Sequence, residues 1–162
     1  MGVGKTTLGE MVADQLALSF YDTDTIIETI EGSSISEIFH EKGELYFREL
    51  ETSVISEIIS EGESCIVATG GGAVVSKHNR GLMREAGRVI WLHLPPSTII
   101  ANVSGERHQR PLLNQDGWQD SIWDLYRSRY VAYLQCDYDL PLTNDLDLDR
   151  SALIHIIRSN AS

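Results

Sequence analysis

The chain opens with MGVGKTT (residues 1–7), which matches the end of a phosphate-binding loop. The pattern G-x-x-x-x-G-K-[ST] ends in a glycine, a lysine and a hydroxyl residue, and Gly4, Lys5 and Thr6 occupy these positions. The first glycine of the pattern would fall before Met1. An apolar strand normally leads into such a loop, so the sequence raises the question of whether it encodes a working nucleotide site.

The loop itself predicts how a nucleotide would be held. Successive backbone N–H groups would surround a polyphosphate, and the N-terminus of the following helix would add its partial positive charge. Lys5 would lie on the β- and γ-phosphates of ATP, and the hydroxyl of Thr6 would coordinate Mg²⁺. The residues predicted to contact the nucleotide here are Gly2, Val3, Gly4, Lys5, Thr6 and Thr7.

Length and composition predict one soluble domain over residues 1–162. No apolar run approaches the ~20 residues of a membrane span, and no signal-peptide pattern is present, which predicts a cytoplasmic protein. Cys65 and Cys136 match no metal or redox spacing, so we expect two buried, reduced thiols. Lys and Arg number 13 against 24 Asp and Glu, a net charge of −11, which argues against nucleic acid as a partner.

Short apolar runs alternate with amphipathic segments along the chain. We expect strands at 18–24, 64–69, 88–94 and 138–143 and helices at 5–17, 24–31, 43–61, 76–86, 97–104, 118–135 and 148–159, with a further short helix capped by Ser34 or Ser36. This alternation predicts an α/β fold, a three-layer α/β/α sandwich with a parallel sheet. The strands at 64–69 and 88–94 are apolar enough to be buried on both faces.

Ligands of such sheets bind at the carboxyl ends of the strands, and candidate residues gather there. Asp22 and Asp24 end the first strand, where they would point to the same side, and could serve a metal's water shell and a substrate hydroxyl; the alternative is an acidic turn that caps the next helix. Gly70–Gly72 follow the second strand and would let a substrate approach the main chain, unless they form a plain flexible turn.

Three arginines also stand out in this acidic chain. Arg48 lies within a long helix, where an arginine is usually a solvated side chain. Arg110 lies in a polar stretch at about 105–117 that is typical of a lid closing on phosphates. Arg129 shares its predicted helix with Arg127, and we expect one of the two to point inward.

Taken in order, these motifs resemble those of shikimate kinase. The matching segments are GVGKTT, DTD, FRELE, ATGGGA, QRPLL and the arginine of RYVAY, and they run the length of the chain with similar gaps. The spaced DTD, FR, GGG and RPL set separates this family from the gluconate and adenylate kinases of the same fold. The resemblance implies a five-stranded parallel sheet and a monomer whose substrates are ATP and shikimate.

The resemblance also implies roles for single residues. The γ-phosphoryl group of ATP would pass to the 3-hydroxyl of shikimate, with Asp24 as the candidate base and Asp22 near Mg²⁺. Arg48 and Arg129 would hold the shikimate carboxylate, Gly70–Gly72 would line the ring, and Lys5 and Arg110 would act on the transferring phosphate. Phe39 and Phe47 match apolar positions near the substrate.

Two departures from the family pattern bear on the nucleotide and substrate sites. Many members carry an arginine seven residues before the lid arginine, where it stacks on adenine; this chain has Val103 there, with Arg107 as a possible replacement. The stretch after Arg129 often reads APLY and is YVAY here, so that Tyr133 is retained.

The start of the chain affects its expected stability. Loss of a central strand would remove roughly four buried aliphatic side chains, about 6–12 kcal/mol, which is comparable with a domain's whole net stability of ~5–15 kcal/mol. We therefore expect that about ten upstream residues are absent, that Met1 is an internal methionine, and that the chain as written folds poorly. A non-catalytic module that binds a nucleotide or a partner remains the alternative to an active kinase.

Overall fold

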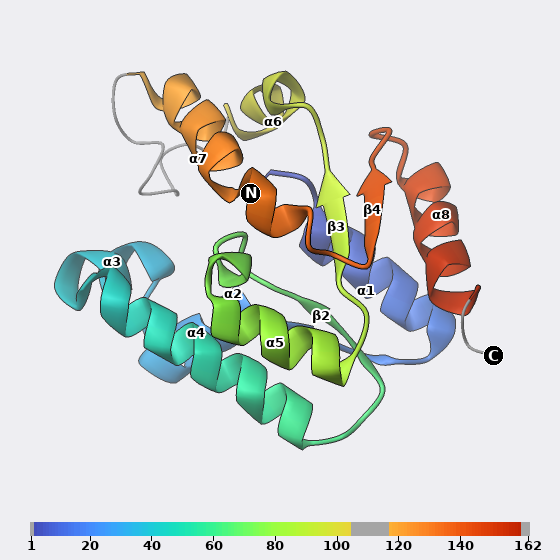
Figure 1. Cartoon of the computed structure of the whole chain (residues 1–162), viewed down its shortest axis with the longest axis horizontal. Helices are drawn as coiled ribbons and strands as arrows, with labels where there is room; N and C mark the ends of the chain where they lie inside the picture. The colour runs from blue at the N-terminus through green and yellow to red at the C-terminus, as the bar shows by residue number, and fades with distance from the viewer. Residues whose placement is uncertain (1, 105–116, 160–162) are drawn as a thin grey trace.

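The computed structural model describes residues 2–104 and 117–159, in which helices alternate with short parallel strands (Figure 1). The strands are β1 (Ser19–Asp22), β2 (Cys65–Ala68), β3 (Ile90–His93) and β4 (Tyr138–Pro141). The helices are α1 (Lys5–Leu16), α2 (Thr23–Glu31), α3 (Ile35–Glu41), α4 (Gly43–Ser60), α5 (Lys77–Ala86), α6 (Pro96–Val103), α7 (Trp118–Tyr133) and α8 (Leu146–Arg158), with a 3-10 turn η1 (Ala73–Val75). The α/β class and the order of elements predicted from the sequence are confirmed.

Local sequence signals fix several helix starts. Ser34 caps α3, because its hydroxyl accepts the N–H of Glu37 while the Glu37 carboxylate accepts the N–H of Ser34. Of the two predicted caps, Ser34 is therefore correct. Asp145 caps α8 in the same general way, accepting the N–H groups of Asp147 and Leu148.

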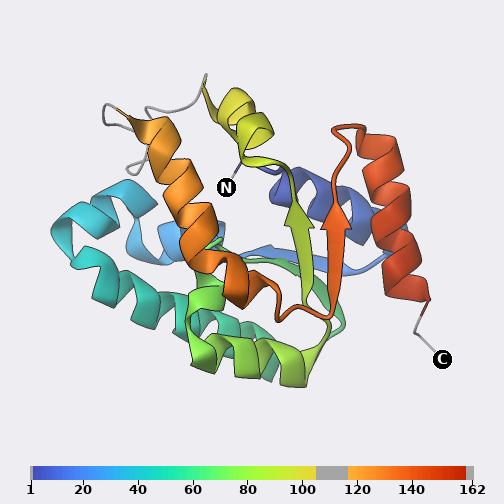
Figure 2. The same ribbon diagram turned by 45° about the horizontal axis from the view of Figure 1, so that its top comes forward.

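The four strands form two separate parallel pairs. β1 pairs with β2 from Ser19 opposite Cys65 to Asp22 opposite Ala68, and β3 pairs with β4 from Ile90 opposite Tyr138 to His93 opposite Pro141. The two pairs run in different directions in both ribbon views (Figures 1 and 2). The five-stranded sheet implied by the resemblance is therefore represented, within residues 2–104 and 117–159, by four strands in two pairs.

Three apolar clusters hold the helices on the strands. One lies between α1, α8 and both strand pairs and includes Leu8, Val12 and Leu153. A second joins α2, α3 and α4 beneath β1 and includes Ile27, Phe47 and Val54. A third joins α6 and α7 around Trp118. Because helices pack on opposite sides of the strands, the layered arrangement expected for this class is present (Figure 1).

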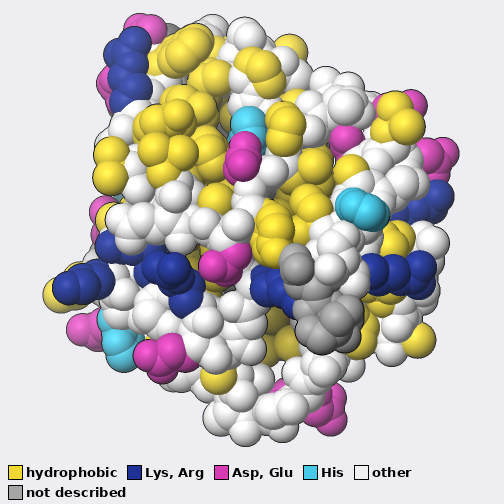
Figure 3. Space-filling view, turned by 45° about the vertical axis from the view of Figure 1, so that its right-hand side comes forward, with side chains coloured by type: hydrophobic (Ala, Val, Ile, Leu, Met, Phe, Trp, Pro, Cys, Tyr) yellow, Lys and Arg dark blue, Asp and Glu magenta, His cyan; other side chains and the backbone are white. Residues whose placement is uncertain are grey.

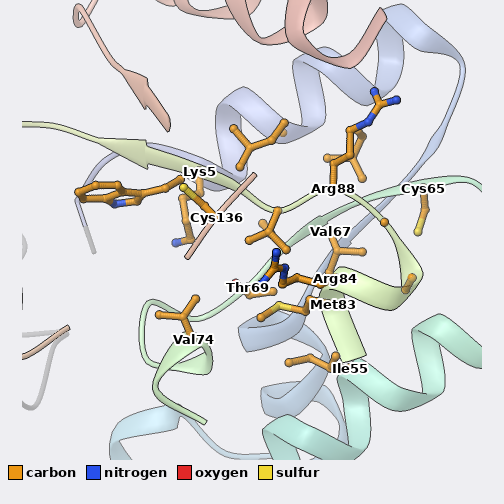
Figure 4. A pocket seen from close by; sticks show the side chains of 18 of the residues that line it. Lys5, Ile55, Cys65, Val67, Thr69, Val74, Met83, Arg84, Arg88 and Cys136 are labelled. Atoms are coloured by element: carbon orange, nitrogen blue, oxygen red, sulfur yellow. The ribbon is translucent and has the colours of Figure 1, made fainter. Parts of the chain in front are cut away.

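A groove of about 680 Å³ separates β2 from β3. Its walls come from both strands and from apolar residues of α4, α5 and α8, and Lys5 lies among the lining residues (Figure 4). Val67 is 37% exposed although it lies in a strand. The prediction that 64–69 and 88–94 are buried on both faces was therefore wrong, because β2 and β3 each border this open groove and are largely half-buried.

The surface carries hydrophobic as well as charged groups. Figure 3 shows hydrophobic side chains gathered on one face beside separate lysine and arginine groups. Among the helices of residues 2–104 and 117–159, none combines the length and apolar character needed to cross a bilayer.

Cys65 and Cys136 are free thiols, as predicted, but they are half-buried rather than buried.

Candidate active site

The phosphate loop (residues 2–7) leads from Gly2 into α1, whose first turn carries Lys5, Thr6 and Thr7. Gly2 and Gly4 both have positive φ angles, 67° and 76°, which L side chains rarely adopt. At Gly2 space is also limiting, since a Cβ would lie 2.5 Å from Cγ1 of Val103. The carbonyl of Gly2 accepts a hydrogen bond from Nδ2 of Asn102 at 3.1 Å, so α6 braces the start of the loop.

Asp22 joins the phosphate loop to α2. Its Oδ1 accepts the N–H groups of Asp24 and Thr25, at 3.0 and 3.3 Å, and its Oδ2 accepts the hydroxyl of Thr6 at 2.7 Å. Asp22 is thus the N-cap of α2, as the alternative interpretation held, and it also contacts the phosphate loop. Asp24 lies in the first turn of α2 rather than at a strand end, so the predicted geometry of two carboxylates on one extended segment was wrong.

The pair Thr6–Asp22 fits a hard divalent cation. Both side chains offer oxygen ligands, and because the Thr6 hydroxyl donates its proton to Asp22, its lone pairs face away from that carboxylate. Within the described residues there is no group of three or more His, Cys, Asp or Glu side chains that could form a complete metal cage. The donor set therefore suits a cation such as Mg²⁺, which keeps waters and nucleotide oxygens among its ligands.

Asp24 and Glu51 converge on Gly70. A Cβ placed on Gly70 would lie 2.8 Å from Oδ1 of Asp24 and 2.8 Å from Oε1 of Glu51, so only glycine fits between these carboxyl groups. The N–H of Gly70 donates to the buried hydroxyl of Thr23 at 3.2 Å, which fixes the end of β2 against α2.

Burial and neighbouring charges act on both carboxyl groups. Burial raises the pKa of Asp24, and the positive charge of Lys5 opposes that shift. Burial likewise raises the pKa of Glu51, while the guanidinium of Arg48 opposes it. Since Asp22 bonds both Thr6 and Asp24, and Lys5 and Gly70 line the same groove, the phosphate loop and the pocket around Gly70 belong to one site.

Arg48 contacts the glycines that follow β2. Its Nη1 donates to Oε2 of the fully buried Glu51 at 3.0 Å. A Cβ on Gly72 would lie 2.5 Å from each of the two terminal nitrogens of Arg48, so the main chain of Gly72 closes the end of the guanidinium. Arg48 is therefore held beside the glycines and is not a freely solvated side chain, whereas its binding of a substrate carboxylate stays a prediction.

Helix α7 brings Arg129 and Tyr133 to the same region. Arg127 is largely exposed and pairs with Asp124, at 3.8 Å, so it is the outward-pointing member of the arginine pair. Arg129 is half-buried, and its charge lowers the pKa of Glu51, opposing the effect of burial there. The hydroxyl of Tyr133 donates to the carbonyl of Gly71 at 2.7 Å, which ties α7 to the glycine segment.

Some predicted features lie elsewhere. Arg107, Arg110 and nearly all of the predicted lid at 105–117 fall outside the described residues. Val103, which replaces the family's adenine-stacking arginine, is 1% exposed and packs in the cluster around Trp118. Phe39 and Phe47 lie beside Arg48, with ring centroids 5.9 and 5.1 Å from its Cζ.

Sequence reasoning missed three contributors to the pocket. Glu44 stands four residues before Arg48 and Glu51 stands three residues after it, and both form ion pairs with Arg48. These spacings place the three side chains on one face of the helix and could have predicted the contacts. Arg80 of α5 donates to the carbonyls of Val74 and Val75, at 2.6 and 3.0 Å, and so holds the turn that follows the glycines. No local signal in the sequence points to Arg80.

A phosphate loop that opens a helix, parallel strands with flanking helices, and an acid-and-arginine pocket at the strand ends define a kinase of the P-loop class. The family model described as "Shikimate kinase" matches residues 1–157. The shikimate kinase of Alkaliphilus oremlandii is 44% identical over 134 residues, which cover 82% of this chain and 79% of that protein. The shikimate kinase of Synechococcus elongatus is 35% identical over 161 residues, 98% of this chain and 83% of that protein.

Solved structures agree with the sequence comparisons. A shikimate kinase from Acinetobacter baumannii in complex with shikimate superposes with a TM-score of 0.92 at 32% identity, covering 100% of this chain and 91% of that one. The chain therefore belongs to the shikimate kinase family, whose members are phosphotransferases.

Proposed function

We propose that this protein transfers the γ-phosphoryl group of ATP to the 3-hydroxyl of shikimate, a step in the biosynthesis of aromatic amino acids. The observation that carries the proposal is the position of Asp22, which accepts the hydroxyl of Thr6 at 2.7 Å and the N–H of Asp24 at 3.0 Å and so joins the phosphate loop to the carboxyl group that lies against Gly70. This link supports the proposal that a phosphate-binding lysine, Lys5, and a proton acceptor, Asp24, act together, as in-line transfer to an alcohol requires.

The proposed roles follow from position. The hydroxyl oxygen attacks the γ-phosphorus, the bond from that phosphorus to the β-phosphate oxygen breaks, and the hydroxyl proton passes to Asp24. Gly2, Val3, Gly4, Lys5, Thr6 and Thr7 would hold the nucleotide phosphates. Thr6 and Asp22 would hold Mg²⁺, which when bound supplies positive charge to the phosphate oxygens.

The residues around Gly70–Gly72 would recognise shikimate, which is an acid. Arg48 and Arg129 would bind the carboxylate of shikimate through paired N–H donors, and Gly70, Gly71 and Gly72 would line the ring. Arg110 would neutralise charge on the transferring phosphate. We further propose a cytoplasmic monomer with no nucleic-acid partner, which the net charge of −11 supports.

A coupled assay of ADP release with shikimate and MgATP tests the proposal. We expect ADP release that depends on shikimate, together with a new phosphate-monoester signal in ³¹P NMR spectra of the product. Nucleotide binding without shikimate-dependent turnover would instead favour the non-catalytic binding module.

A further inference from the structure

The guanidinium of Arg48 is shared between two glutamates of its own helix. Nη1 donates to Oε2 of Glu51 at 3.0 Å, while Nε and Nη2 both donate to Oε1 of Glu44, at 3.3 and 3.2 Å. An arginine can bind a carboxylate bidentately either through its two terminal nitrogens or through the edge formed by Nε and Nη2. Which of these edges is open decides how an incoming carboxylate can bind.

The end of the guanidinium is closed by the protein itself. Gly72 lies so near that a Cβ there would be 2.5 Å from both Nη1 and Nη2. The rings of Phe39 and Phe47 lie beside the guanidinium, with centroids 5.9 and 5.1 Å from Cζ. The Nε–Nη2 edge is therefore the one through which a substrate carboxylate can pair, and Glu44 occupies it.

The two glutamates differ in how firmly they are held. The side chain of Glu51 is fully buried, whereas that of Glu44 is 68% exposed and bonds Arg48 through a single oxygen. An exposed ion pair such as Glu44–Arg48 contributes little to stability, because water and salt screen the two charges. Breaking the pair of Arg48 with the buried Glu51 would cost much more, because it would leave a buried charge without its partner. Glu44 can thus leave at low cost, and Glu51 keeps Arg48 in place when it does.

We propose that Glu44 is a competing internal carboxylate, which occupies the Nε–Nη2 edge of Arg48 until the carboxylate of the substrate displaces it. This inference rests on the proposed function, in which Arg48 binds an acid. Glu44 then sets specificity: a simple carboxylate gains little by the exchange, whereas shikimate gains further contacts at Gly70–Gly72 and Asp24. The substrate affinity of the wild-type protein is correspondingly lower than Arg48 alone would give.

Binding of shikimate by calorimetry and steady-state kinetics of Glu44→Gln test the proposal. We expect shikimate to bind about two- to fivefold more tightly and KM to fall by a similar factor, the range that an exposed ion pair contributes, with kcat unchanged. Acetate should inhibit Glu44→Gln more strongly than wild type, because the edge of Arg48 is free.

Two further variants separate the contact from general charge effects. Glu49→Gln removes the same charge from an exposed position of the same helix and should leave the affinity for shikimate unchanged. Glu44→Asp keeps the charge but shortens the side chain, so it should resemble Glu44→Gln. Equal shikimate affinities for wild type, Glu44→Gln and Glu49→Gln would overturn the inference alone, whereas a wild-type protein that neither binds nor phosphorylates shikimate would overturn the proposed function as well.

Discussion

The acid pocket, formed by acidic and arginine side chains around Gly70–Gly72, and the phosphate loop lie side by side, yet they are held in different ways. Around the glycine segment, contacts come from four helices: Thr23 bonds Gly70, Tyr133 bonds Gly71, Arg48 contacts Gly72, and Arg80 holds the turn beyond them. Among residues 2–104 and 117–159, the phosphate loop has fewer contacts of this kind, chiefly Asn102 at the carbonyl of Gly2 and Asp22 at the hydroxyl of Thr6.

The environment of the two regions differs as well. Glu51 and Gly70 are buried, whereas Gly4 and Thr6 are exposed, and Lys5 borders the open groove between β2 and β3. The acid pocket is therefore preorganised by long-range contacts, whereas fewer such contacts within the described residues hold the phosphate loop. Preorganised polar groups contribute strongly to binding and to transition-state stabilisation, so substitutions in the pocket should affect substrate binding and turnover more than folding.

The largest expected effect comes from Asp24→Asn. This change removes the proton acceptor but keeps the size of the side chain beside Gly70, so kcat should fall by about 10²- to 10⁴-fold. The affinity for ATP, measured by fluorescence titration, should change little, because the phosphate loop is untouched. Asp14→Asn, at an exposed position of α1, is the control and should be silent. Undiminished turnover in Asp24→Asn would remove this carboxyl group from the chemistry.

Gly72→Ala should affect binding of the acid specifically. The new Cβ would collide with both terminal nitrogens of Arg48, and because these atoms end a flexible side chain, the arginine shifts while the fold persists. We expect KM for shikimate to rise by about ten- to 100-fold, the cost of losing a charge-assisted bidentate contact of ~1.5–3 kcal/mol.

The matched control for this change is Gly81→Ala. A Cβ at Gly81 meets nothing within 4 Å, and alanine is favoured over glycine within a helix such as α5. Normal shikimate binding by Gly72→Ala would show that the guanidinium does not need its observed position.

The same contrast explains what the sequence could and could not predict. Gly4, Lys5 and Thr6 are recognisable because a phosphate loop is a local device whose residues are contiguous. The elements were also predictable, since caps such as Ser34 and helical spacing act over a few residues. Asp22 could be placed at the site, but its dual role as helix cap and partner of Thr6 depends on where α1 lies.

The acid pocket was harder to predict because its parts come from distant elements. Arg48 gained a role only through the family resemblance, since helical position alone does not reveal that Gly72 lies against it. Arg80 carries no local signal at all. The burial of the apolar run at 64–69 was overestimated because hydrophobicity reports what a strand can bury, whereas exposure depends on its neighbours, and β2 borders the groove.

A smaller effect is expected from Tyr133→Phe. This change removes the hydroxyl that donates to Gly71 at 2.7 Å but keeps the ring, which stacks on Trp91 with centroids 5.2 Å apart. Loss of one such hydrogen bond contributes ~0.5–1.5 kcal/mol, so KM for shikimate should rise about two- to tenfold. Tyr130→Phe alters a 40% exposed tyrosine of the same helix and should change KM little. Equal effects of the two variants would contradict a bracing role for Tyr133.

The smallest effect expected is a change in how stability depends on pH in Glu51→Gln. Burial raises the pKa of the Glu51 carboxyl above its ordinary value of 4.5, so the native state binds this proton more tightly than the unfolded state does. The stabilisation from that proton is fully present below pH 4.5 and is lost as pH rises through the native pKa. Burial shifts Asp24 in the same direction, so the informative quantity is the difference between the two proteins.

Thermal unfolding measured from pH 4.5 upward supplies that difference. The wild-type protein should lose more stability than Glu51→Gln over this range, because glutamine does not titrate. Glu49→Gln, at an exposed position of α4, should keep the wild-type slope. Parallel curves for wild type and Glu51→Gln would mean that Arg48 and Arg129 fully offset the cost of burying the charge, and the acid pocket would then be electrostatically balanced before any substrate carboxylate enters.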